Sequence, residues 1–252
     1  MDIKHNPLLD QFFLNNQEIV KKIVDFAGLN SNDIVLEVGA GTGNLTAELA
    51  KKASRVIAFE IDPRFKPFLN KLPKNVEVHI QNAWEYIQLH GKFKKTKEYN
   101  KIVSNLPYSF AEQFLHNLTF LQYDKAILLV PIKLVDTISK NGIFSSFFQA
   151  KILLEVHKTD FFPIPRTNSA VIDLIKLPDP LENHDLGLFL RQYIYQHENQ
   201  LVKNSLTEGL VKYFQCTKKE AKNKILDSKI TEELINKRPN NPEIYWEITK
   251  CF

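Results

Sequence analysis

The chain has 252 residues, of which 44% are hydrophobic and 25% are charged, and its formal net charge is +4. These values are ordinary for a folded soluble protein. No apolar run reaches about 18 residues and no secretory signal is visible, so we expect a cytoplasmic protein without a membrane span. Cys216 and Cys251 are too few for a disulfide framework or a zinc cluster, and no metal site is expected.

In chain order, strand and helix patterns alternate up to residue 177. Apolar residues at helical spacing predict helices over residues 16–29, 44–53 and 112–118, the first of which stops at Gly28. Short apolar runs predict strands over residues 33–39, 55–62, 76–80, 101–104, 125–130 and 169–177. Residues 146–158 mix the two patterns. This alternation predicts an α/β fold with a parallel sheet.

The pattern changes after the proline-containing segment 178–183, which we interpret as a linker. Only helical patterns follow it, so we expect one domain over residues 1–180 and a small helical domain over residues 181–252. Two segments, 91–101 and 211–224, each carry five Lys against one Glu. They are either solvated faces or contacts with the phosphates of a nucleic acid.

Three glycines, Gly39, Gly41 and Gly43, lie between a predicted strand and a predicted helix. Glycines there let the backbone turn sharply and approach a ligand closely. The dinucleotide pattern G-x-G-x-x-G fails because Asn44 holds its last position, and no Gly-Lys-Ser/Thr follows for a P-loop. Glu60 comes 21 residues after Gly39, where a carboxylate can accept hydrogen bonds from a ribose diol, and Asp62 could share that role. This order points to S-adenosylmethionine, an adenosine cofactor without a pyrophosphate, and resembles the class I methyltransferases.

The tetrad Asn105-Leu106-Pro107-Tyr108 follows the strand that we expect beside the glycine loop. Pro107 fixes the turn and keeps Leu106 extended, so the Asn105 amide oxygen and a backbone carbonyl can both accept from an exocyclic amine. Tyr108 offers a flat face on which an extruded base can stack. The tetrad therefore predicts an amino-methyltransferase site. A glutamine target, a DNA-adenine target and a simple Asn-Pro turn remain alternatives.

Three further segments, 10–24, 161–177 and 199–206, resemble motifs of the ribosomal RNA adenine dimethyltransferases. The resemblance implies a Rossmann-like, seven-stranded methyltransferase domain followed by a small helical domain. It implies the transfer of two methyl groups to N6 of an adenine in small-subunit rRNA, on a pre-ribosomal particle and by a monomer. The cofactor-binding residues that it implies are Phe12, Leu14, Gly39, Gly41, Gly43, Glu60, Asn82 and Asn105. The catalytic residues that it implies are Asn105, Leu106, Pro107, Tyr108 and Phe161, with the last two enclosing the target base.

The chain departs from the family pattern at several positions. Phe12 stands where the family has Asn or His, and Asn82 stands where an Asp usually pairs with the adenine amine. The segment 200–202 replaces an Arg-Arg-Lys that would bind phosphates. These departures leave two alternatives open. One is a large-subunit dimethyltransferase of the antibiotic-resistance type, and the other is a non-catalytic ribosome-assembly or transcription factor.

Overall fold

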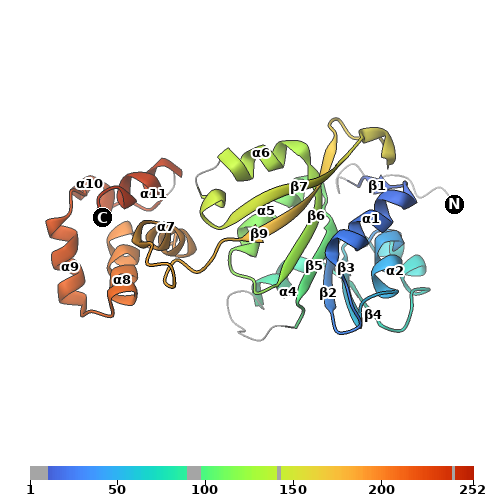
Figure 1. Ribbon diagram of the computed structural model, residues 1–252, viewed down its shortest axis with the longest axis horizontal. Helices are drawn as coiled ribbons and strands as arrows, with labels where there is room; N and C mark the ends of the chain where they lie inside the picture. The colour runs from blue at the N-terminus through green and yellow to red at the C-terminus, as the bar shows by residue number, and fades with distance from the viewer. Residues whose placement is uncertain (1–10, 90–97, 141–142, 240–241) are drawn as a thin grey trace. The chain divides into compact units, whose positions relative to one another are not determined.

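The computed structural model describes residues 11–89, 98–140, 143–239 and 242–252. The chain forms two compact units (Figure 1). The first contains the chain up to Asp136 and Ala150–Ile175, and the second contains Thr137–Gln149 and Lys176–Phe252. The unit boundary therefore lies five residues before the expected one, and residues 137–149 belong with the helical unit instead of the first domain. The reason is local packing, because the Phe147 ring lies 5.5 Å from that of Tyr195.

The first unit is built on a seven-stranded sheet whose strands run in the order β4-β3-β2-β5-β6-β9-β7. The strands are β2 (Ile34–Val38), β3 (Arg55–Glu60), β4 (Val76–Ile80), β5 (Lys101–Asn105), β6 (Lys125–Pro131), β7 (Phe148–Val156) and β9 (Ser169–Lys176). From β4 to β6 all neighbours are parallel, whereas β9 is antiparallel to β6. The expected neighbours β2 and β5 are confirmed. Strand order reverses between them, and such a switch point is where open α/β sheets bind ligands.

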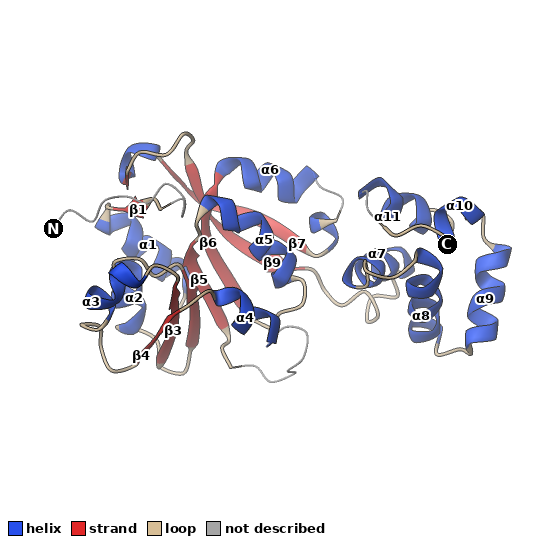
Figure 2. Ribbon diagram, turned by 180° about the vertical axis from the view of Figure 1, so that it is seen from behind, coloured by secondary structure: helices blue, strands red, loops and turns tan. Residues whose placement is uncertain are grey.

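Helices cover both faces of this sheet. The helices α1 (Gln17–Ala27) and α2 (Asn44–Ala50) lie on one face, while α4 (Ala83–Gln88) and α5 (Tyr108–Leu118) lie on the other (Figures 1 and 2). The remaining helices of the unit are short: α3 (Lys66–Leu69) and 3-10 turns at Pro63–Phe65 and Lys158–Asp160. The helix α6 (Ile132–Lys140) crosses the unit boundary, and the 3-10 turn at Phe144–Ser146 belongs to the second unit. The α1 helix begins where the Asn16 side chain accepts from the Glu18 and Ile19 amides and ends at Gly28, whose φ of 58° suits glycine.

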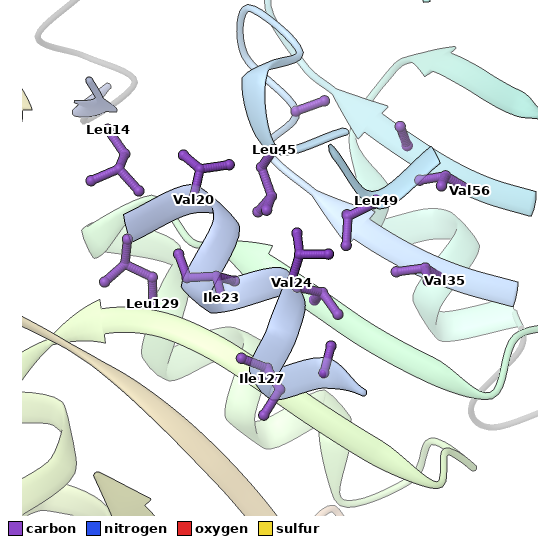
Figure 3. Packing of buried hydrophobic residues seen from close by; sticks show 14 of the residues in the cluster. Leu14, Val20, Ile23, Val24, Val35, Leu45, Leu49, Val56, Ile127 and Leu129 are labelled. Carbon is purple, nitrogen blue, oxygen red and sulfur yellow. The ribbon is translucent and has the colours of Figure 1, made fainter. Parts of the chain in front are cut away.

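The core beneath α1 and α2 joins these helices to the central strands (Figure 3). Ile23 and Leu49 are fully buried there, against Val35, Val56 and Ile127 of three strands. Burial of one such side chain stabilises the fold by about 1.5–3 kcal/mol. Outside the sheet, β1 (Phe13–Leu14) pairs with β8 (Phe161–Phe162) in a separate two-stranded ribbon.

The second unit contains the helices α7 (Leu186–Gln196), α8 (Val202–Phe214), α9 (Lys218–Asp227), α10 (Glu232–Ile235) and α11 (Pro242–Thr249). Leu190, Leu206 and Ile248 are fully buried among them. The Arg191 guanidinium lies 4.1 Å from the centre of the Trp246 ring. In the part of the chain that the structure describes, no helix is long and apolar enough to cross a bilayer.

Candidate cofactor site and active site

A cavity of about 250 Å³ opens at the carboxyl ends of the parallel strands. It lies within the first unit, and its walls come from β1, from the loops after β2, β3 and β4, and from the tetrad after β5. Nine of the predicted site residues line it: Phe12, Leu14, Gly39, Gly41, Glu60, Asn82, Asn105, Leu106 and Pro107. The fold therefore brings together residues from five separate segments of the sequence.

The glycine loop touches the tetrad directly. Gly39 has a φ of 82°, and a Cβ added there would lie 3.3 Å from Cδ of Pro107 and 3.5 Å from the carbonyl oxygen of Asn105. Glycine is thus required at position 39 for two reasons: the left-handed backbone conformation, and the close approach of the glycine loop to the tetrad. Gly43 differs from the expectation, because it does not line the cavity. It turns the chain into α2 with a φ of 84°, and its Cα faces Leu69 and Leu72.

Glu60 holds the glycine loop as well as lining the cavity. Its Oε2 accepts from the Gly41 amide at 2.7 Å and its Oε1 accepts from the Asp62 amide at 2.8 Å. Each carboxylate oxygen can accept a second hydrogen bond, so a ribose contact stays possible. Asp62 does not line the cavity, since it accepts from Gln11 at 2.8 Å and pairs with Arg64. Hydrogen bonds from Arg64 lower the pKa of Asp62 to about 2.

Asn82 lines the cavity but also caps a helix. Its Oδ1 accepts from the Trp84 amide at 3.0 Å, and this bond starts α4. Asn is among the best residues at such a position. An adenine amine would therefore be a second donor to this oxygen.

The orientation of the Asn105 amide follows from one hydrogen bond. Nδ2 of Asn105 donates to the Phe12 carbonyl oxygen at 3.2 Å. A carbonyl oxygen can only accept, so the NH2 group must face Phe12 and Oδ1 must face away from it. The next residue, Leu106, is buried, and its amide donates to the Leu129 carbonyl at 3.2 Å.

The aromatic residues are arranged differently from the expectation. The Tyr108 ring does not line the cavity; it lies 4.9 Å from the Phe12 ring, and its hydroxyl is hydrogen-bonded to the buried Ser169 hydroxyl. Phe161 is only 2% exposed, because it pairs with Leu14 in the ribbon and packs in the core. It offers no free face to a base, whereas Phe162 beside it is 61% exposed. The expected enclosure of a base between Tyr108 and Phe161 is therefore not what the structure shows.

Glu37, which precedes the glycine loop, lies near the end of β2 and lines the cavity, although it was not among the predicted site residues. Its side chain is buried and its Oε2 makes no hydrogen bond. Burial raises the pKa of Glu37 to about 8. The nearby Thr46 hydroxyl acts to lower this pKa, but it lies outside normal hydrogen-bond geometry with the Glu37 carboxyl. In the sequence Glu37 is the acid of the pattern Glu-x-Gly-x-Gly-x-Gly, which resembles the class I methyltransferases but gives this acid no role of its own.

The charges around the cavity indicate which cofactor fits. Two acidic residues, Glu37 and Glu60, belong to the described lining residues, and no Lys, Arg or His does. Such a cavity disfavours phosphates and favours a positively charged ligand. A sulfonium nucleoside therefore fits, and a pyrophosphate cofactor does not. Within the described ranges, no group of three or more His, Cys, Asp or Glu side chains is placed to bind a metal ion.

Comparisons with known proteins agree with this geometry. The profile of the family described as ribosomal RNA adenine dimethylase matches residues 3–237. A probable ribosomal RNA small subunit methyltransferase A of Methanococcus vannielii is 35% identical over 82% of this chain and 81% of its own length. The ribosomal RNA small subunit methyltransferase A of Thermotoga maritima is 32% identical, over 79% of this chain and 73% of its own.

Two solved structures share the fold. The dimethyladenosine transferase of Plasmodium falciparum superposes with a TM-score of 0.58 at 21% identity, over 94% of this chain and 98% of its own. The 23S rRNA methyltransferase ErmE gives a TM-score of 0.59 at 18% identity, over 94% and 98%. At these identities the likeness shows the fold alone, and the profile match and the sequence relatives decide the family. On those grounds the chain belongs to the ribosomal RNA adenine dimethylase family.

Proposed function

We propose that the chain transfers two methyl groups from S-adenosylmethionine to N6 of an adenine in small-subunit ribosomal RNA. The observation that carries this proposal is the contact between the glycine loop and the tetrad, where Gly39 faces Pro107 and the Asn105 carbonyl. A cofactor above the glycines would thus have the tetrad beside it. The lining charges fit a cationic cofactor, and the curated relatives named above carry the small-subunit name.

In this proposal the protein acts mainly by positioning. The bound cofactor supplies an electrophilic methyl group. Asn105 Oδ1, held away from the Phe12 carbonyl, accepts from the adenine amine and keeps its nitrogen lone pair out of conjugation with the ring. The amine nitrogen forms the new bond to the methyl carbon as the bond from carbon to sulfur breaks, and the resulting ammonium loses a proton to water. Positioning of reacting groups can account for a large part of such a rate enhancement.

The aromatic wall beside the tetrad differs from the family pattern. Phe12 lines the cavity and its ring packs on Tyr108. We infer that the Phe12 ring, supported from behind by Tyr108, forms one wall for the base, with Phe110 lining the cavity nearby. Stacking of a base on an aromatic side chain contributes about 1–3 kcal/mol. Phe161 has a structural role in this reading, since it anchors the ribbon that presents Phe12.

The helical unit is proposed to bind rRNA phosphates through the lysines of residues 211–224. In the described structure these residues form the end of α8 and most of α9, and the lysines of α9 are exposed. The other lysine-rich segment, 91–101, falls largely outside the described residues. We propose that the protein works as a monomer, in the cytoplasm, on a pre-ribosomal small subunit.

Labelled cofactor and separated immature small and large ribosomal subunits test the proposal. We expect label in the small subunit, recovered as N6,N6-dimethyladenosine after digestion to nucleosides. Label confined to the large subunit would favour the antibiotic-resistance type, and no label in either would favour the non-catalytic alternative. The Asn105→Ala variant should lower turnover by roughly 100-fold or more, as removal of a polar group that stabilises developing charge does. The exposed Asn70→Ala is the matched control and should keep full activity.

A near wild-type rate of dimethylation by a folded Asn105→Ala that binds cofactor would refute the catalytic role of the tetrad. Melting temperature and cofactor affinity are therefore measured on the same samples.

A further inference from the structure

One oxygen of the buried Glu37 carboxyl has no hydrogen-bond partner among the described residues. Glu37 is 1% exposed, it stands at the cavity wall, and Oε2 is the oxygen without a partner. A buried polar atom without a partner costs about 1–3 kcal/mol or more, so natural proteins rarely keep one without a use. A carboxylate could be satisfied here by a positively charged ligand in the cavity.

The surroundings of Glu37 keep its carboxyl group neutral in the free protein. Burial raises its pKa to about 8, and the nearby Glu60 carboxylate acts in the same direction. Glu60 is the charged group that faces it from β3, while Thr46 of α2 brings no charge. The described lining residues include no Lys, Arg or His whose positive charge would lower the pKa of Glu37.

We propose that Glu37 is protonated in the free protein and becomes the counter-charge of the cofactor, so that binding of S-adenosylmethionine releases one proton to solvent. This inference rests on the cofactor of the proposed function. The O–H bond of the Glu37 carboxyl breaks, its electron pair stays on the oxygen, and the proton goes to the buffer. The sulfonium and ammonium of the ligand then face an ionised carboxylate, and nothing is oxidised or reduced.

A specific pH dependence follows. Below pH 8 the binding-competent, ionised form of Glu37 is a minor species, and its share grows up to tenfold per pH unit. Between pH 6 and pH 8 the affinity for S-adenosylmethionine should therefore rise about 50-fold, provided that the pKa in the complex lies well below 6. The ammonium of the ligand titrates at about pH 8 and would only oppose this rise.

Calorimetric titration of the full chain with S-adenosylmethionine tests the inference. At pH 7, titrations in buffers of different ionisation enthalpy give the number of protons released. We expect wild type to release about 0.9 proton more than Glu37→Gln, because a group with a pKa near 8 is about 90% protonated at pH 7. Protons from the ligand or from Glu60 appear in both proteins and cancel in the difference. The control Glu112→Gln removes an exposed carboxyl from α5 and should match wild type.

Equal proton release by wild type and a binding-competent Glu37→Gln would overturn this inference and leave the proposed cofactor intact. If Glu37→Gln does not bind, unfolding of the two proteins without cofactor decides: a difference in unfolding free energy that grows from pH 5 to pH 8 supports the inference, and a constant difference overturns it. Failure of wild type to bind S-adenosylmethionine at any pH would overturn the proposed function as well.

Discussion

Replacing the Glu37 carboxyl by an amide should stabilise the free protein increasingly as pH rises from about 5 to 8. The pKa of this buried carboxyl is raised from its ordinary 4.5 to about 8. Below pH 4.5 it is protonated in both the folded and the unfolded chain and its titration has no effect on stability. Between the two values the unfolded chain ionises while the folded chain stays protonated, so wild type loses stability. Glu37→Gln has no such loss.

The expected size follows from the width of this window. At about 1.36 kcal/mol per pKa unit, a rise from 4.5 to about 8 corresponds to about 5 kcal/mol of unfolding free energy, an upper bound for the effect. The Gln side chain introduces a buried NH2 group, whose lost hydrogen bonds cost about 1–3 kcal/mol at every pH. The slope with pH is therefore the diagnostic quantity, and the constant offset is not.

Urea unfolding of wild type and Glu37→Gln without cofactor, in steps from pH 4.5 to 9, measures this slope. The difference in unfolding free energy should grow by up to about 1.4 kcal/mol per pH unit and level off above pH 8. Glu112→Gln, which removes an exposed carboxyl, should show no such slope. A difference between wild type and Glu37→Gln that stays constant across the range would refute the reasoning, because Glu37 would then be ionised in the folded protein.

Three other outcomes are expected. Tyr108→Phe and Ser169→Ala remove the same hydrogen bond, so each should lower turnover by about 3-fold to 10-fold, and the double variant should be no worse than either one; additive losses in the methyl-transfer assay would contradict this coupling. Glu60→Gln should weaken binding of S-adenosylmethionine at least about 10-fold, because one carboxylate oxygen that accepts from a backbone amide becomes a donor; calorimetry showing wild-type affinity would remove Glu60 from the site. Replacing three lysines within residues 211–224 should flatten the salt dependence of rRNA binding, since fewer counterions are released; a slope identical to wild type would mean that these lysines only face solvent.

The parts of the fold that the sequence predicted are those with long or repeated local signals. The buried strands of the sheet and the helix ending at Gly28 have such signals, and the structure confirms them. The α5 helix starts at Tyr108, four residues before the expected start, because the chain turns into the helix directly after Pro107. Residues 146–158, which mixed two patterns, form mainly the strand β7, while the helices α4 and α6 were not predicted.

The sequence predicted those site residues that belong to one short, recognisable motif. Gly39 and Glu60 belong to a strand, loop and strand pattern, and both line the cavity. The sequence could not show that Phe161 is buried, because its burial depends on pairing with β1, about 150 residues earlier in the chain. A two-residue strand has no periodicity to detect. Glu37 belongs to the pattern before the glycines, but its own role could not be predicted because that role depends on burial and on the other charges of the cavity.

The β1–β8 ribbon also sets an order of events during synthesis. Phe12 and β1 leave the ribosome early, together with the glycine loop, Glu60 and, somewhat later, the tetrad. The partner of β1 in the ribbon, Phe161–Phe162, is made about 150 residues after it, and Asp160 beside it accepts from both Asn15 and Asn16 at 2.9 Å. A nascent chain therefore holds nearly every residue of the cavity well before one wall is fixed in place. Capture of the cofactor should come late, when synthesis of the methyltransferase unit is almost complete.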